Sequence, residues 1–358
     1  MLVIDSHLDM SMNAIIYDRD LTMSVEKIRQ KEKNDPYSKP KMLGSNSSGN
    51  NTVSLPELRK GEIFLSLFTI LATVKNQKRG LFSSSDIAYS VAHAELTYYN
   101  LLESKNLLRM IKTKEDLHSH FNDWRKHSDS TPLGFVLAME GADPILEPNQ
   151  LKYWWDKGLR VLSLCHYDEN QYGYGTGVKG KLKPSGYKLL EEMEKLGMVM
   201  DVTHFSEQCF WDALDAFNGD ILASHNNCRS LVPGVRQFSD DQINAIIERG
   251  GVIGVALDNW MLHEGWVTGK TPLELVTLQN VVDHIDHICE ISGDTEHAAI
   301  GTDLDGGYGK EQSPSDLDTI VDLQKIVSIL EERGYSQPNI EKIMYKNWLR
   351  KLEQTMPS

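Results

Sequence analysis

The chain has 358 residues, of which 40% are hydrophobic and 25% charged, which is ordinary for a water-soluble globular protein with a large core. Its 51 acidic residues outnumber 37 basic ones, giving a net charge of -14, which argues against a nucleic-acid partner because phosphate binding needs a basic surface. With no apolar stretch approaching the ~20 residues of a membrane helix and no signal-like N-terminus, we expect a cytoplasmic protein without a membrane partner.

Apolar, β-rich runs alternate along the chain with amphipathic segments of helical length. Most runs are almost continuously hydrophobic, as expected for parallel strands covered on both faces. The pattern predicts one α/β domain over residues 1–358, a (β/α)8 TIM-like barrel. An open doubly wound sheet is the alternative, although no GxGxxG or P-loop sequence supports it. The predicted strands are Leu2–His7, Ile63–Leu71, Gly134–Met139, Arg160–Leu164, Met198–Thr203, Ile221–Ser224, Gly251–Leu257 and Ala298–Thr302.

Three further regions complete the predicted architecture. Residues 17–55 are polar and contain the run Gly44–Asn51, which predicts a long solvated insertion after the first strand, either a lid over the barrel mouth or a surface insertion. Residues 338–353 are expected to form a C-terminal closing helix. The other predicted helices are Asp86–Ser104, Ser185–Leu196, Glu207–Phe217, Asp240–Arg249, Pro272–Ile291 and Ser315–Arg333.

Histidines and carboxylates follow the downstream ends of these strands, where a parallel barrel collects its catalytic groups. His7 and Asp9 are two positions apart, so both side chains point to the same side of a strand. Glu140 ends a hydrophobic run, where a carboxylate needs a cation. His204 and His225 end two successive strands. This ligand set suits zinc and related divalent ions.

The ligand count favours two ions. His7 and Asp9 would bind one, His204 and His225 the other, and Glu140 would bridge them with its two oxygens. A single ion with a mixed ligand shell is the alternative. The other histidines are expected to be ordinary structural or surface residues, and the pair His284 and His287 is expected to lie on a solvated helix face.

Taken in order, the motifs resemble the membrane (renal-type) dipeptidases, a peptidase family (M19) of the amidohydrolase superfamily. Each motif is weak alone, but together they run from residue 5 to residue 350. The matching segments are Asp5–Met10, Leu55–Gly61, Glu140–Gly141, Leu162–Asn170, Asp201–His204, Ser224–Arg229, Gly301–Gly306 and Asn347–Arg350. The chain departs from the family at Gly234–Gln237, where it keeps Arg236 but loses both of the usual neighbours, which puts substrate preference in doubt.

The resemblance implies a TIM-like barrel with two zinc ions held by His7, Asp9, Glu140, His204 and His225. It also implies dipeptides as substrates, tolerance of a D-residue at the C-terminal position, and a homodimer. In the mechanism we expect, hydroxide held between the ions attacks the scissile carbonyl.

Three more residues receive roles in that mechanism. His166 would stabilise the developing oxyanion and contact the substrate, and Asp303 would carry a proton to the leaving amine. Arg236 would bind the terminal carboxylate of the substrate, with Arg229 as the competing candidate. The alternatives are another hydrolase of the superfamily (an amidase, lactonase or deaminase) and a non-catalytic protein that keeps the barrel.

Overall fold

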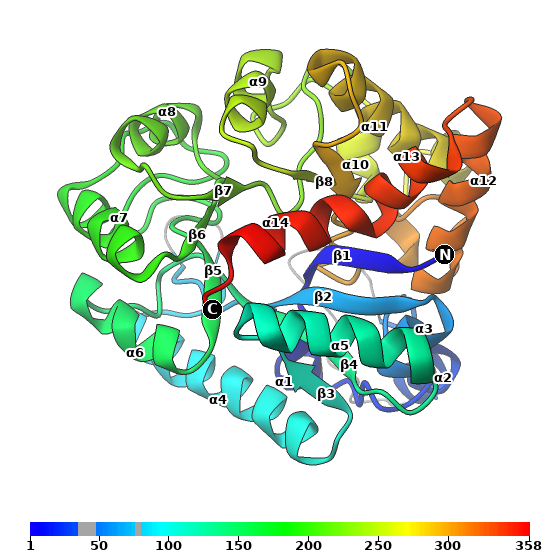
Figure 1. The fold of residues 1–358 in the computed structure, drawn as a ribbon, viewed down its shortest axis with the longest axis horizontal. Coiled ribbons are helices and arrows are strands. Elements are labelled where there is room, and N and C mark those ends of the chain that lie inside the picture. The colour runs from blue at the N-terminus through cyan, green and yellow to red at the C-terminus, as the bar shows by residue number, and fades with distance from the viewer. Residues whose placement is uncertain (35–47, 76–79) are drawn as a thin grey trace.

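The computed structural model describes residues 1–34, 48–75 and 80–358. Within these ranges, short parallel strands occupy the centre of the molecule and helices surround them (Figure 1). The strands are β1 (Val3–Leu8), β2 (Ile63–Ile70), β3 (Leu108–Met110), β4 (Leu133–Glu140), β5 (Leu159–Ser163), β6 (Val199–Asp201), β7 (Ile221–Leu222), β8 (Ile253–Val255) and β9 (Ala298–Ile300).

The helices follow the strands in chain order, as a parallel sheet requires. They are α1 (Met10–Ile15), α2 (Val25–Asn34), α3 (Leu55–Lys60), α4 (Ser85–Ser104), α5 (Lys114–His127), α6 (Leu151–Asp156), α7 (Pro184–Leu196), α8 (Glu207–Ala216), α9 (Asp240–Glu248), α10 (Asn259–Leu262), α11 (Leu278–Ser292), α12 (Gln324–Glu332), α13 (Gln337–Glu341) and α14 (Asn347–Thr355).

Strand pairing defines a curled parallel sheet in the order β1-β2-β4-β5-β6-β7. Strand β3 pairs with residues 133–135, at the start of β4. Strand β5 pairs with β4 further along the chain, from residue 137 onward. All the residues of β1, β2, β4 and β5 are buried, which explains their nearly continuous hydrophobic sequences. Because all pairs are parallel, the carboxyl ends of the strands lie at one edge.

Strands β8 and β9 form a second parallel pair. A single bridge between Ala223 and Ile253 links this pair to β7. On its other side, the backbone nitrogen of Asp303 donates to the carbonyl of His7 at 3.3 Å. Inside the curl, the Ser6 hydroxyl donates to the carbonyls of Ser224 and, at 3.0 Å, Ile300. The sheet therefore curls far enough to bring its two ends close together, although the hydrogen bonds between strands form two separate sheets.

Glycine makes the closest approaches in this interior possible. A Cβ added at Gly254 would lie 2.1 Å from the carbonyl oxygen of Ser224, and one at Gly301 would lie 1.9 Å from the same oxygen. Any side chain at these positions would push β8 and β9 away from β7.

All eight predicted strands are present, most of them shorter than expected. Strand β3 and the short helices α1, α3, α6 and α10 were not predicted. Helix α5 was also missed, even though a full capping box of Thr113 and Asp116 starts it. In the polar region 17–55, residues 25–34 form helix α2, which was also not predicted. Residues 44–47 of the glycine- and serine-rich run lie outside the described residues.

The described parts of region 17–55 are attached to the loop that follows β9. The backbone nitrogens of Thr52 and Val53 donate to the buried carboxylate of Asp305 at 2.8–3.0 Å. Arg19 lies 3.8 Å from the same carboxylate and pairs with Glu32 of α2 at 2.7 Å. These contacts fix the region beside the carboxyl ends of β1 and β9.

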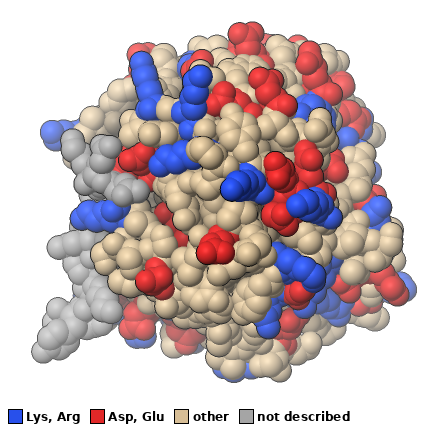
Figure 2. Space-filling view, turned by 90° about the vertical axis from the view of Figure 1, so that its left-hand side faces the viewer, with Lys and Arg blue, Asp and Glu red and all other residues tan. Residues whose placement is uncertain are grey.

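The molecular surface carries both signs of charge. Figure 2 shows acidic and basic side chains interspersed over one face. Within the described ranges, every helix is too short or too polar to cross a membrane.

Helix α14 lies next to β1 in Figure 1. Its Asn347 donates to the carbonyl of Thr295 and its Lys351 pairs with Asp220, so it lies at the amino ends of β9 and β7. Residues 337–355, which include the segment expected to be a closing helix, form α13, a π-helical turn at 342–346 and α14. The Trp348 indole is fully buried and its nitrogen donates to the carbonyl of Ile300 at 2.8 Å. This contact fixes α14 to β9.

Replacing this indole should therefore destabilise the whole fold. We expect Trp348→Ala to lower the free energy of unfolding by about 3–5 kcal/mol, because it creates a large internal cavity. Urea unfolding measures the change. Leu101→Ala, at a half-exposed position of α4, is the control and should change stability by less than about 1 kcal/mol. Equal effects of the two changes would show that α14 does not close the core.

Candidate metal centre

The side chains expected at the strand ends meet in one place. His7 lies in β1, Asp9 directly after it, and Glu140 is the last residue of β4. The others follow β5, β6, β7 and β9, and Arg236 comes from the segment between β7 and α9. The residues gathered here are His7, Asp9, Glu140, His166, His204, His225, Arg236 and Asp303, and nearly all are buried.

Glu140 lies at the middle of the cluster. Its Oε2 is 3.5 Å from His7 Nε2, while its Oε1 is 3.0 Å from His204 Nε2 and 3.3 Å from His225 Nε2. The two oxygens of one carboxylate thus face different imidazoles, the arrangement that a bridging ligand needs. His166 Nε2 also approaches Oε1, at 3.8 Å.

Among the described residues, ligand-type atoms form three overlapping groups, each with its atoms within 4.8 Å of one another. The groups are His7 with Glu140 and His225; Glu140 with His166 and His204; and His7 with Asp9 and Asp303. Glu140 belongs to two groups and so does His7. Such overlap fits neighbouring cations that share ligands.

The polar atoms of the cluster are left in need of a cation. His7 Nε2 is buried and has no hydrogen-bond partner, although a buried polar atom without one is costly. The Nε2 atoms of His204 and His225 face each other at 3.1 Å, so at most one of them can carry a proton there. Imidazole nitrogens and carboxylate oxygens are the donors that zinc prefers, and these residues fit such an ion.

The electrostatics of the cluster agree with that fit. Burial alone lowers the pKa of His7, but the carboxylates of Glu140, Asp9 and Asp303 raise it to about 10. Burial alone raises the pKa of Glu140, yet the charges of His7 and then His166 hold it well below its usual range. A protonated His7 therefore supplies, in this structure, positive charge that the carboxylates require.

The other two histidines are held in the neutral form that a metal ligand needs. Burial, followed by the charge of Arg236, lowers the pKa of His204 well below its usual value. Burial, followed by the charge of His7, does the same for the pKa of His225.

Hydroxyl groups behind the cluster orient its imidazoles. The Ser224 hydroxyl donates to Asp201 Oδ2 at 2.5 Å and lies 2.8 Å from His225 Nδ1 and 3.5 Å from His7 Nδ1. The Thr176 hydroxyl lies 3.1 Å from His204 Nδ1. Partners of this kind fix the orientation of metal-binding histidines and tune their basicity.

The backbone is strained at two of these positions. His204 and Asp303 have φ values of 70° and 57°, in the left-handed region that non-glycine residues avoid. Such a conformation costs on the order of 1–3 kcal/mol and is concentrated at functional sites. In both cases the turn directs the side chain into the cluster just after a strand ends.

The two arginines considered for substrate binding are in different surroundings. Arg236 is 3% exposed and lines the cavity, with its guanidinium donating to Asn226 Oδ1 at 3.1 Å and to the carbonyl of His225 at 2.9 Å. Arg229 instead pairs with Glu207 at 3.0 Å near the surface. The structure brings Arg236 to the site and leaves Arg229 out of it.

One expectation for the remaining histidines is wrong. His284 is not on a solvated helix face: it is 1% exposed, and its Nδ1 accepts from the backbone nitrogen of Cys228 at 3.1 Å. Burial lowers its pKa to about 3. Its partner in the predicted pair, His287, contacts Asp240 at 3.0 Å. The helix α11 turns His284 toward the core, and neither residue lies at the cluster.

The cluster opens into a cavity that continues outward. The inner part is lined by three of the candidate ligands, Asp9, Glu140 and His204, together with Arg236, Tyr167, Asp258 and Trp260. Tyr167, Asp258 and Trp260 also line an outer chamber. Sequence reasoning missed Asp258, although it directly follows the predicted strand Gly251–Leu257, at the position that identified the other candidates.

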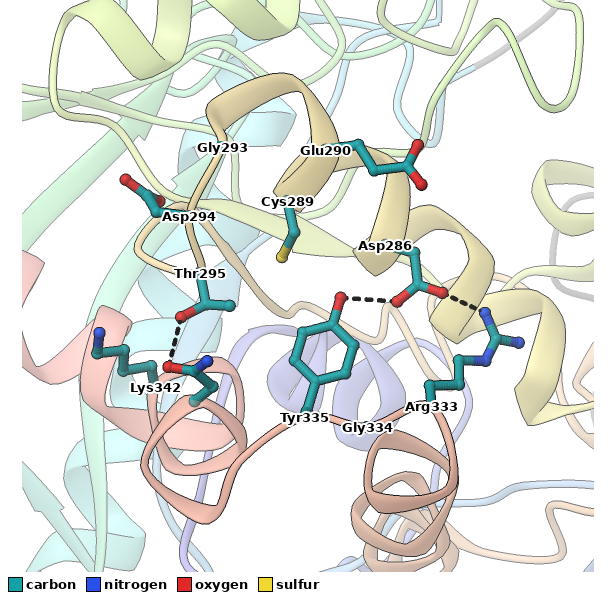
Figure 3. A pocket seen from close by; sticks show the side chains of 11 residues that line it. Asp286, Cys289, Glu290, Gly293, Asp294, Thr295, Arg333, Gly334, Tyr335 and Lys342 are labelled. Carbon is teal, nitrogen blue, oxygen red and sulfur yellow. Dashed lines mark hydrogen bonds and ion pairs between the residues drawn. The ribbon is translucent and has the colours of Figure 1, made fainter.

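Another pocket lies at the opposite end of β9, between α11 and the residues around α12 and α13 (Figure 3). Asp286 in its wall accepts from the Tyr335 hydroxyl at 2.7 Å and pairs with Arg333. Thr295, also in this wall, precedes β9, whereas Asp303 follows it. The pocket is therefore separate from the cluster and contains none of its residues.

Comparison with known proteins gives consistent matches. The sequence profile of membrane dipeptidases (peptidase family M19) matches residues 1–357. An uncharacterized protein in the pqqA 5' region of Klebsiella pneumoniae is 31% identical over 233 residues, covering 62% of this chain and 82% of the relative. The dipeptidase tcpJ of Claviceps purpurea is 26% identical over 306 residues, covering 83% and 67%.

Two solved structures share the fold over almost the whole chain. The dipeptidase AC, a metallopeptidase of family M19, superposes with a TM-score of 0.81 at 20% identity, covering 100% of this chain and 99% of the other. A metallopeptidase from Rhodobacter sphaeroides, liganded with a phosphinate mimic of the dipeptide L-Ala-D-Ala, gives a TM-score of 0.78 at 21% identity, covering 99% of both chains.

The charge state of His7 predicts that metal binding releases protons. With a pKa of about 10, His7 is protonated in the metal-free protein at pH 8 and must lose that proton to coordinate an ion. The apparent affinity for zinc should therefore rise about tenfold per pH unit for each proton released, up to about pH 10. Calorimetric titration with zinc, in buffers of different ionisation enthalpy, counts the protons. Heats that do not depend on the buffer would contradict the prediction.

Proposed function

Because the chain belongs to the membrane dipeptidase family (peptidase family M19), we propose that it hydrolyses the peptide bond of dipeptides at a centre that binds two zinc ions. The observation that carries this proposal is the position of Glu140, with one oxygen toward His7 and the other toward His204 and His225. His7 and Asp9 would hold one ion, His204 and His225 the other, with Glu140 shared. Bound ions would polarise the scissile carbonyl and lower the pKa of water toward about 7.

Asp303 is the proposed proton carrier. It lies 3.8 Å from His7 and lines the cavity, so it reaches both the cluster and a bound substrate. Burial, with the nearby charges of Asp9 and Glu140, raises its pKa well above the usual value for an aspartate, against the opposing effect of His7. A carboxyl of raised pKa can accept a proton from water and deliver it to the leaving amine.

Arg236 is the proposed binding group for the carboxylate of the substrate. None of its described partners is a carboxylate within ion-pair distance, so a buried guanidinium faces the cavity without a direct anionic partner. A free C-terminal carboxylate would compensate that charge through charge-assisted hydrogen bonds. This requirement would limit the enzyme to very short peptides.

His166 completes the proposed substrate site. It lines the cavity beside Glu140 and contacts the ring of Tyr167, with centroids 4.8 Å apart. From there its imidazole would donate to the oxygen of the scissile carbonyl as negative charge develops on it. We also infer that the contacts of β8 and β9 with β7 and β1 complete an eight-stranded barrel around the site.

Substrates with a C-terminal D-residue are included in the proposal. The support is the Rhodobacter sphaeroides relative, whose structure holds a mimic of L-Ala-D-Ala. The alternative is another hydrolase of the superfamily, such as an amidase, lactonase or deaminase, acting through the same ligands. A panel of L,L- and L,D-dipeptides, lactones and nucleobases, assayed with zinc-loaded protein, separates these possibilities. Absence of dipeptide turnover would exclude the proposed function.

Two carboxylate variants should separate metal binding from proton transfer. Glu140→Gln should lower zinc content and activity together, because the bridge loses its charge. Asp303→Asn should keep its zinc and lose about 10²–10⁴-fold in kcat, because the proton carrier is gone. Elemental analysis alongside dipeptide kinetics tests both. An Asp303→Asn enzyme with full activity would show that this carboxyl carries no proton in the reaction.

Removing the guanidinium should affect substrates according to their C-terminus. We expect Arg236→Ala to lower kcat/KM by about 10²-fold or more for a dipeptide with a free carboxylate, since a buried charged hydrogen bond is lost. The same change should have little effect on kcat/KM for the C-terminally amidated dipeptide, which we expect to be a poor substrate of the parent enzyme as well. Arg229→Ala is the matched control and should behave like the parent enzyme. Equal losses on the free and amidated substrates would contradict the assignment.

A further inference from the structure

One carboxylate in the cavity has no part in the proposed reaction. Asp258 follows β8, is 6% exposed, and lines both the inner cavity and the outer chamber. It belongs to none of the groups of candidate metal ligands among the described residues. It therefore stands at the boundary between the metal centre and the route outward.

The bonds that hold Asp258 do not neutralise it. Gln312 Nε2 donates to its Oδ1 at 2.8 Å, and the backbone nitrogen of Trp260 donates to the same oxygen at 3.3 Å. Both donors are uncharged, and no ion pair with a basic side chain is formed within the described residues. Burial raises the pKa of Asp258 to about 7 despite these bonds and the charge of Arg236. A cation beside it would relieve this desolvation.

The outer chamber has the composition of a cation-binding site. Asp258 is the one charged residue among the described residues that line it. Four aromatic residues, Tyr167, Trp260, Trp266 and Tyr308, are among those that line the same chamber. Aromatic faces attract cations through their quadrupole, and a carboxylate at the inner end adds a charge-assisted hydrogen bond.

Helix capping is the simpler explanation for Asp258, but it leaves the charge unexplained. Asp258 is the N-cap of α10, a helix of four residues, and its side chain accepts from Trp260. Asparagine or serine caps a helix about as well as aspartate and would bury no charge. Capping therefore explains the hydrogen bond to Trp260 but not the choice of an acid at the mouth of the cavity.

The position of Arg236 indicates which part of a substrate would meet Asp258. Both residues line the inner cavity. If Arg236 binds the terminal carboxylate, the side chain branching from the adjacent carbon begins close to Asp258 and has the outer chamber ahead of it. We propose that Asp258 selects dipeptides whose C-terminal residue carries a cationic side chain, such as lysine or arginine. The inference rests on the proposed dipeptidase activity and names the substrate class that the site favours.

The experiment compares matched dipeptides with the parent enzyme and with Asp258→Asn, which keeps the cap and removes the charge. The substrates are Ala-Lys and Ala-norleucine, together with Lys-Ala and norleucine-Ala for the N-terminal position. We expect the parent to prefer Ala-Lys over Ala-norleucine by at least about tenfold in kcat/KM. Asp258→Asn should abolish that preference, mainly by raising KM for Ala-Lys, and should change kcat/KM for Ala-norleucine much less than kcat/KM for Ala-Lys.

Further variants guard against a general loss of structure. Asp258→Lys should reverse the preference toward Ala-Glu, which a purely structural role would not produce. Thermal unfolding of each variant shows whether the fold is kept, and Asp294→Asn, at an exposed aspartate, is the control. Equal use of Ala-Lys and Ala-norleucine by the parent would overturn the inference, as would a preference confined to Lys-Ala. A uniform loss on all four dipeptides in Asp258→Asn would also overturn it.

The design separates this inference from the proposed function. If the zinc-loaded parent hydrolyses none of the four dipeptides, the dipeptidase proposal itself fails. If it hydrolyses Ala-norleucine and Ala-Lys equally well, only the role of Asp258 fails.

Discussion

The burial of Glu140 among imidazoles is the interaction on which the site depends. A carboxylate 4% exposed at the end of a hydrophobic strand is unstable without positive charge on each side of it. In this structure His7 supplies part of that charge, because the surrounding carboxylates raise its pKa to about 10. Divalent cations would supply it more completely and would release the proton of His7. The centre of the sheet is thus built around a requirement for cations.

The sheet meets this requirement by bringing together residues distant in sequence. Every described strand except β2 and β3 contributes one or two groups at or just after its carboxyl end, and the turns that follow direct them inward. At His204 and Asp303 this direction requires a left-handed backbone, so strain is concentrated where the chemistry is expected. Behind the cluster, Ser224 contacts both His7 and His225, so one hydroxyl couples the orientation of imidazoles from β1 and from the end of β7.

The cavity in front of the cluster combines charges of opposite sign. Arg236 and Asp258 are both buried, and in each case the described hydrogen-bond partners are uncharged. A substrate that carries both an anion and a cation would compensate both charges. In a protein with a net charge of -14, general attraction favours cations, so the binding of an anion requires a local group such as Arg236.

Much of the fold could be predicted from local sequence, because parallel strands buried on both faces are continuously hydrophobic and alternate with capped helices. The elements that were missed have weaker signals, and four of them, α1, α3, α6 and α10, have only 4 to 6 residues. Strand β3 has three residues, α5 has few apolar positions, and α2 lies in a polar region. His284 was misplaced because the spacing along a helix does not reveal which face packs against the core.

The sequence by itself determined which strand ends carry histidine or carboxylate, and that sufficed to name the candidate ligands, since parallel strands end at one edge. Only the tertiary structure decided how those groups face one another. The direction of each oxygen of Glu140, the position of Arg229 away from the cavity and the place of Asp258 at the cavity mouth depend on the curl of the sheet and on loop conformation. These are set by contacts between residues far apart in sequence, such as Asp5 and Thr302, which are 297 positions apart, and no local pattern encodes such contacts.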